Sequence, residues 1–316
     1  MRGLLRSRTL RVAFAVVALA LLVVSAATQW GDIRPRVHDL GAVSIGAALL
    51  AVLAGLWCSL LSWRAVLADL GSPLTTRDAE RVFFVGQLGK YLPGSLWPIL
   101  AQMELGRDLH VPRRRSAAAA VVIFGINVVT GAIVALGTLP LVDRDALGAR
   151  GWALLAVPVG IALLHPRVVN PALNRGLRLL RREPLDQPLT YAGLLRAAAW
   201  ALAMWLCYGG QLYLLLRDLD ASGARLVPLA VGAFALAWVV GFLFVIAPAG
   251  AGVREGTLVV ALGGALAAPA ATLVALVSRL LMTIGDLVWG GLAIAWTGRR
   301  RLADVARAER DVAASV

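Results

Sequence analysis

Metal-ligating and acidic side chains are scarce in this sequence. It has 2 cysteines, 3 histidines and 18 acidic residues, and charged residues make up only 16% of the chain. Two isolated cysteines, Cys58 and Cys207, make neither a disulfide framework nor a metal cluster. The three histidines are too scattered for a metal-ligand spacing such as HExxH. We therefore expect no metal site and no cofactor.

Apolar residues dominate the chain instead. They make up 59% of it, and the mean hydropathy is +0.78, whereas soluble domains are about 45–50% apolar. The sequence therefore predicts an all-α fold, a polytopic transmembrane helical bundle. The first apolar run follows a basic stretch, as in a signal peptide, but its length favours an uncleaved helix. Runs long enough to cross about 30 Å of hydrocarbon occupy residues 12–29, 40–62, 116–140, 191–216, 226–247 and 270–297.

Three shorter apolar pieces lie at 82–103, 152–164 and 256–268. The first and the last adjoin segments rich in glycine and proline, which interrupt membrane helices. We expect broken, half-length or re-entrant helices there. Whether 82–103 and 226–268 re-enter or cross stays open at this point.

The basic residues are unevenly distributed, and the formal net charge is +13. Short segments that end membrane helices on the cytoplasmic side carry excess Lys and Arg. This rule predicts a multi-pass protein of a bacterial-type cell membrane with both termini cytoplasmic, and anionic lipid rather than nucleic acid as the partner. We expect a membrane domain at 1–298 and a charged cytoplasmic tail at 299–316. The segments that hold 23 of the 31 basic residues are 1–11, 63–115, 165–196 and 298–316.

The first broken segment reads QLGKYLPGSLWP over residues 87–98. Gly89, Pro93 and Gly94 disfavour a continuous helix, and irregular backbone at membrane depth requires a protein or water-filled surrounding. Lys90 is the only lysine in a chain with 30 arginines, and free backbone amides beside it suit an anion. The alternative is an ordinary cytoplasmic loop with an interfacial Trp and Tyr91.

The second broken segment covers residues 247–256 and contains adjacent charges, Arg254 and Glu255. Its spacing is not that of a nucleotide-binding glycine loop. A broken helix explains the glycines, and a surface turn with a solvated Arg–Glu pair is the alternative. The predicted break residues are Gly89, Pro248, Gly250, Gly252 and Gly256.

The last long apolar run contains two charges, Arg279 and Asp286. Seven residues separate them, so both point to one helix face about 10 Å apart. Each charge costs roughly 2.5–3.5 kcal/mol at the bilayer centre, so we expect both to face the bundle interior. We expect Arg279 to meet Glu255, and Asp286 to meet Arg254 or Lys90. A purely structural network is the alternative to a substrate path.

The segments GQLGKYLPGSLW and PAGAGVREG resemble the paired motifs of the lysylphosphatidylglycerol synthase transmembrane family, also called flippase-like proteins. Members include the membrane half of the multiple peptide resistance factor, associated with moving aminoacylated lipid between leaflets. The second motif of the family usually reads PGGLGVREG, from which Ala249 and Ala251 depart. The resemblance implies transport of a lipid rather than its synthesis.

Together these features favour a membrane transporter that moves an anionic phospholipid or a lipid-linked headgroup, polyprenyl-phosphate or aminoacyl-phospholipid, between leaflets. The alternatives are a membrane-embedded glycosyltransferase-type enzyme and a non-catalytic partner of a lipid synthase or glycosyltransferase. We assign no catalytic residue. The predicted substrate-binding residues are Lys90, Tyr91, Pro93, Gly94, Arg254, Glu255, Arg279 and Asp286.

Overall fold

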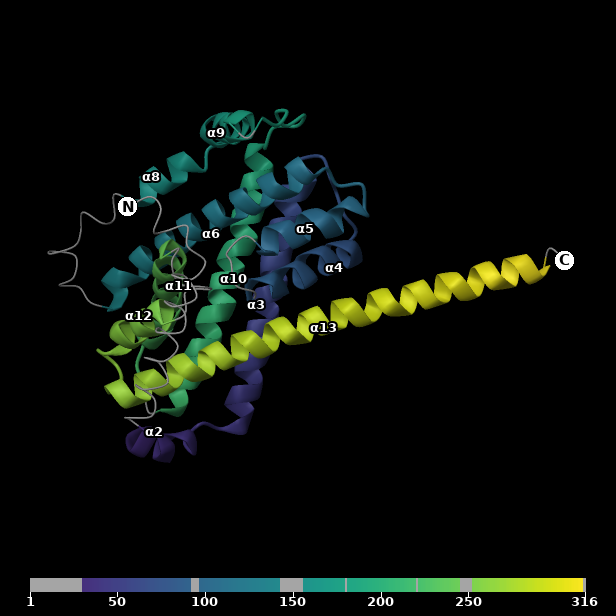
Figure 1. Cartoon of the computed structure of the whole chain (residues 1–316). Coiled ribbons are helices and arrows are strands. Elements are labelled where there is room, and N and C mark those ends of the chain that lie inside the picture. Colours follow the sequence, from purple (N-terminus) through teal and green to yellow (C-terminus); the bar gives the residue numbers. More distant parts are fainter. Residues whose placement is uncertain are drawn as a thin grey trace, which may run out of the picture.

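A computed structural model describes residues 30–91, 97–142, 156–179, 181–219, 221–244 and 252–314. Every regular element in these ranges is helical, which confirms the all-α prediction (Figure 1). Five helices contain segments long and apolar enough to span a membrane, and they match five of the six predicted runs. The run at 12–29 lies outside the described residues. The five helices are α3 (Ala42–Asp69), α6 (Arg113–Val142), α10 (Tyr191–Asp218), α11 (Leu226–Leu243) and α13 (Ala268–Ala314).

The helices α3 and α10 lie side by side and antiparallel along their whole length (Figure 1). At one end the Asp69 carboxylate accepts hydrogen bonds of 2.7 Å from the backbone N–H and the hydroxyl of Thr190, the N-cap residue of α10. At the other end the Asp218 carboxylate accepts a 2.8 Å hydrogen bond from the Ser44 hydroxyl. Carboxylates therefore fix the register of this pair at both ends.

The end of the bundle at Asp69 is also where α6 begins. There the Arg115 guanidinium donates a 2.7 Å hydrogen bond to the carbonyl of Gly71, and the Arg114 guanidinium donates one of 2.5 Å to the Asp186 carboxylate. We call this the basic end. The opposite end holds α2 (Trp30–Val37) and the first residues of α3 and α13.

A first hairpin, called hairpin 1, consists of α4 (Thr76–Gln87), the 3₁₀ turn η2 (Leu88–Tyr91) and α5 (Trp97–Arg107). It starts and finishes at the basic end, and its tip packs on α13, where Leu88 contacts Gly290. Trp289 of α13 stacks on Phe84 and donates 3.1 Å to the carbonyl of Leu53, near the middle of α3. Hairpin 1 therefore reaches about halfway along the bundle, as expected for the run at 82–103.

A second hairpin, called hairpin 2, consists of α11 and α12 (Val253–Leu262). Along α11, which is antiparallel to α6, Gly232 packs against Thr138 and Phe242 against Phe124. Since Phe124 lies eleven residues into α6, α11 ends about 16 Å short of the basic end. The ten residues of α12 span about 15 Å and return to the opposite end, where α13 starts. This confirms the half-length helix expected near 256–268.

The two hairpins enter the bundle from opposite ends and lie on opposite sides of the α3–α10 pair (Figure 1). The helix α13 contacts both of them. It continues unbroken past residue 298, so the expected tail extends the same helix to Ala314. Two peripheral helices, α8 (Ala156–Leu163) and α9 (Pro166–Leu179), connect α6 to α10.

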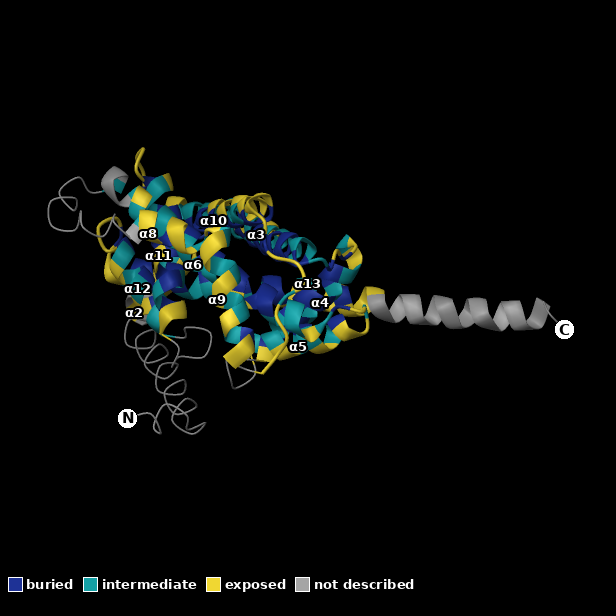
Figure 2. Ribbon diagram, turned by 90° about the horizontal axis from the view of Figure 1, so that it is seen from above, coloured by how far each residue is buried: buried dark blue, intermediate teal, exposed yellow. Residues whose placement is uncertain are grey.

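Burial follows the membrane pattern. Buried residues occupy the bundle interior, and exposed residues cover its outer faces (Figure 2). Many of the exposed side chains are large and apolar, such as Val260 at 82% and Leu50 at 67% exposure. Apolar side chains on the outside of a helical bundle suit contact with lipid tails. The chain is thus a polytopic membrane protein.

Candidate functional site

Asp286, in the middle of the spanning part of α13, connects this helix to the tip of hairpin 1. One of its carboxylate oxygens, Oδ2, lies 2.6 Å from Lys90 Nζ and accepts a 2.6 Å hydrogen bond from the Tyr91 hydroxyl. The Asp286 side chain is 3% exposed and that of Lys90 is 29% exposed. Of the two partners expected for Asp286, the structure selects Lys90.

Glu255 connects α13 to hairpin 2. Its Oε1 lies 3.1 Å from Arg279 Nη1, which confirms the expected pair. Its Oε2 accepts a 2.6 Å hydrogen bond from the backbone N–H of Gly252, the N-cap residue of α12. Gly252 has φ +81°, in the left-handed region that favours glycine. Glu255 therefore caps its own helix and holds Arg279 at the same time.

Arg254 differs from the other two cations. Its guanidinium lies over the Phe234 ring of α11, 4.6 Å from the ring centroid. Among the described residues no carboxylate lies within salt-bridge distance of it. The aromatic face supplies a cation–π attraction but no opposite charge.

We call Lys90, Arg254, Glu255, Arg279 and Asp286 the interior charge cluster. Three cations and two carboxylates leave it with a net charge of +1. The two ion pairs lie about two turns apart on one face of α13. The tips of both hairpins therefore meet α13 within about 10 Å of each other along its axis.

The remaining predicted residues are placed as follows. Gly89 allows α5 to approach closely, because a Cβ there would lie 2.9 Å from the backbone of Trp97. At Gly256 a Cβ would meet open space, so packing does not require glycine there. Pro93, Gly94, Pro248 and Gly250 lie outside the described residues.

The model of the lysylphosphatidylglycerol synthase TM region matches residues 10–290 of this sequence. The chain belongs to this family. The match includes both hairpins, both broken segments and the whole interior charge cluster. No curated protein matches the sequence. As a member of the lysylphosphatidylglycerol synthase TM family, the chain is a membrane protein linked to lipid metabolism or transport.

In this family member the site also includes residues that the sequence did not single out. Phe234 covers Arg254, and its ring lies 5.1 Å from that of Tyr208 on α10. Gln211 on α10 donates 2.8 Å to the Ser278 hydroxyl, one residue before Arg279. Within apolar runs these residues look like ordinary core residues, and only the packing of α10 and α11 on α13 reveals their place.

Proposed function

We propose that this protein moves an anionic lipid, or a lipid-linked headgroup such as a polyprenyl phosphate or an aminoacyl-phospholipid, between the two leaflets. The observation that supports this most strongly is the net positive interior charge cluster. A buried charge is costly unless it is compensated. A headgroup phosphate that enters the cluster supplies the missing negative charge, while its acyl chains stay in the hydrocarbon.

The exposure of the paired groups supports this assignment. The side chains of Lys90 and Arg279 are 29% and 28% exposed, whereas their carboxylate partners are 3% and 5% exposed. The cations thus face the accessible side and the carboxylates lie behind them. In our proposal Asp286 and Glu255 hold the cations in position when the site is empty, and the phosphate oxygens replace part of these contacts on binding.

The opposed hairpins support a route with two gates. Hairpin 1 separates the interior charge cluster from the basic end, and hairpin 2 approaches it from the opposite end. Transporters commonly place substrate sites where broken helices meet near the bilayer midplane. Displacement of one hairpin from α13 would expose the cluster toward one leaflet, and displacement of the other toward the second leaflet.

The basic end faces the cytoplasm in this proposal, because excess arginine marks that side. The protein then lies in a bacterial-type cell membrane, and the long end of α13 projects into the cytoplasm. A lipid synthase or glycosyltransferase in the same membrane is the kind of partner that would supply or consume the lipid. The proposal assigns no catalytic step to the chain itself.

The test is lipid exchange in vesicles. Purified protein is reconstituted with headgroup-labelled fluorescent phosphatidylglycerol, and the outer label is quenched with a reductant that does not cross the membrane. Protein-containing vesicles should lose the protected fraction of the signal, and vesicles with Arg279→Ala protein should not. Arg196→Ala, an exposed arginine on α10, is the matched control and should behave as wild type. No acceleration with phosphatidylglycerol, an aminoacyl-phospholipid or a polyprenyl phosphate would reject the proposal.

A further inference from the structure

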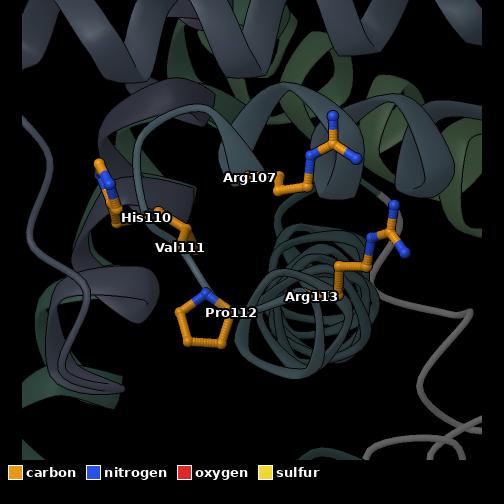
Figure 3. Close-up of a pocket in the computed structure, with 5 residues that line it drawn as sticks. All are labelled: Arg107, His110, Val111, Pro112 and Arg113. Carbon is orange, nitrogen blue, oxygen red and sulfur yellow. The ribbon is translucent and has the colours of Figure 1, made fainter.

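A hollow of 410 Å³ opens at the basic end, between the end of α5 and the start of α6 (Figure 3). The hollow is shallow and open to the surface rather than an enclosed cavity. Arg113 is the first residue of the candidate membrane span in α6, so the hollow lies where lipid headgroups surround the helix ends. The residues that line it are Arg107, His110, Val111, Pro112 and Arg113.

The rim of the hollow carries an excess of positive charge. Arg107 and Arg113 both pair with one carboxylate, that of Glu104, at 2.9 and 2.5 Å. The hydrogen bond from Arg113 lowers the pKa of Glu104, so this carboxylate stays ionised and holds both cations. The neighbouring Asp108 faces Arg81 at 3.6 Å. Two guanidinium groups thus share one anion, and both project on the same side of the hollow (Figure 3).

The floor of the hollow is apolar. Val111 is buried at 4% exposure, and the Pro112 ring lies beside it between the two arginines and His110 (Figure 3). An apolar floor with a cationic rim suits an amphiphilic group, in which a phosphate meets the guanidinium donors and a glycerol backbone covers the proline. Arginine is well matched to phosphate because its planar fork donates two parallel hydrogen bonds.

His110 ends α5 and also lines the hollow. The backbone N–H of Val111 donates a 3.0 Å hydrogen bond to the carbonyl of Gly106, and the backbone N–H of His110 donates one of 3.0 Å to the carbonyl of Arg107. This is the pattern that ends a helix through a residue in the left-handed conformation. Glycine usually occupies this position, yet His110 adopts φ +59° there. Arg181 ends α9 with the same hydrogen-bond pattern at φ +54°, so this conformation accounts for the end of the helix, and it is the position of the imidazole that relates His110 to the hollow. The imidazole lies on the rim opposite the two arginines (Figure 3).

We propose that this hollow is a phosphate-binding site at the membrane surface, separate from the interior charge cluster. The phosphate can come from an anionic lipid headgroup or from solution, and the position of the hollow at the start of a membrane span favours the headgroup. The site lies at the base of hairpin 1, whose tip carries Lys90. The proposal does not depend on lipid exchange, because it concerns binding alone.

The experiment measures binding of short-chain phosphatidylglycerol to the full-length protein in a neutral detergent, by the rise in its unfolding temperature. A parallel arm uses inorganic phosphate. The Arg107→Gln/Arg113→Gln double variant should bind phosphatidylglycerol about tenfold more weakly. The matched control, Arg175→Gln/Arg178→Gln, removes two exposed arginines from α9 at the same end and should bind as wild type. Because the interior charge cluster is also proposed to bind this lipid, the hollow is identified by the part of the binding that the double variant loses and the control keeps. If that part is seen with phosphatidylglycerol alone, the hollow is a lipid site; if it is seen with both ligands, the hollow takes phosphate from either source.

A second variant keeps the test valid if the double variant folds poorly. His110→Gly relieves the left-handed strain, so it should raise the unfolding temperature without ligand and yet weaken phosphatidylglycerol binding. Wild-type affinity in this variant, in a protein of raised stability, means that His110 only ends the helix and overturns its part in the site. Unchanged binding of phosphatidylglycerol in a folded Arg107→Gln/Arg113→Gln variant, absence of wild-type binding to either probe, or equal loss in the α9 control overturns the proposal as a whole.

Discussion

Lys90 Nζ lies 2.6 Å from Asp286 Oδ2, although the two residues come from opposite halves of the chain. The pair joins the tip of hairpin 1 to the middle of the long helix α13. The carboxylate is almost fully buried, whereas the ammonium is partly accessible. The contact therefore fixes the hairpin and at the same time presents a cation to the site.

We predict that Asp286→Ala destabilises the protein. It leaves Lys90 without its carboxylate and Tyr91 without its hydrogen-bond acceptor. Breaking a fully buried pair costs about 3–5 kcal/mol, and the partial exposure of Lys90 lowers our expectation to about 2 kcal/mol. Asp286→Asn keeps a hydrogen-bond acceptor for Tyr91, so it should lower the free energy of unfolding by less. Thermal unfolding in detergent measures both, and equal stability of Asp286→Ala and wild type would contradict the role of this contact.

For Arg254 we predict opposite effects on stability and transport. Arg254→Met removes the cation that has no carboxylate partner among the described residues and keeps an unbranched apolar chain over Phe234. Stability should stay the same or rise, because an uncompensated interior charge is lost. Exchange of phosphatidylglycerol should fall at least about tenfold, which corresponds to about 1.4 kcal/mol. Wild-type exchange in this variant would remove Arg254 from the site.

Glu255 should show two separable contributions. Glu255→Gln keeps an oxygen for the Gly252 N–H but loses the charge that holds Arg279, whereas Glu255→Ala loses both contacts. We expect Glu255→Ala to be the less stable by about 1 kcal/mol, the usual effect of losing a helix cap. A double-mutant cycle with Arg279→Met should give a coupling energy of about 0.5–3 kcal/mol. Additive effects would show that the pair contributes nothing measurable.

Glu80 on α4 gives a prediction about pH. It is 5% exposed, its Oε2 has no hydrogen-bond partner among the described residues, and desolvation raises its pKa, with the charge of Arg77 acting in the other direction. The folded state therefore binds this proton more tightly than the unfolded state, so stability falls as the pH rises from the ordinary glutamate pKa through the raised one. Glu80→Gln should raise the unfolding temperature at pH 7.5. The difference in unfolding temperature between Glu80→Gln and wild type should shrink as the pH approaches about 4.3. A difference that does not change with pH would show that ionisation of Glu80 is not its cause.

The length and composition of the apolar runs were enough to predict the spanning helices, because crossing the hydrocarbon demands both. The pairing of Arg279 with Glu255 was also predictable, since interior charges need partners. The choice of Lys90 over Arg254 for Asp286 was not, because it depends on how far η2 reaches toward α13. The contact of Phe234 with Arg254 could not be predicted, because an aromatic residue in an apolar run indicates only that the side chain is buried. The hollow beside His110 likewise required the backbone conformation at the end of α5.

The two ion pairs of α13 lie on one face of one continuous helix, and this has a mechanical consequence. An axial slide or rotation of α13 displaces Asp286 and Arg279 together, so neither hairpin can respond to such a motion alone. In the proposed function, α13 therefore couples the motions of the two hairpins. The helix continues to Ala314, so in the proposed function a force applied to its C-terminal part would act on both hairpins.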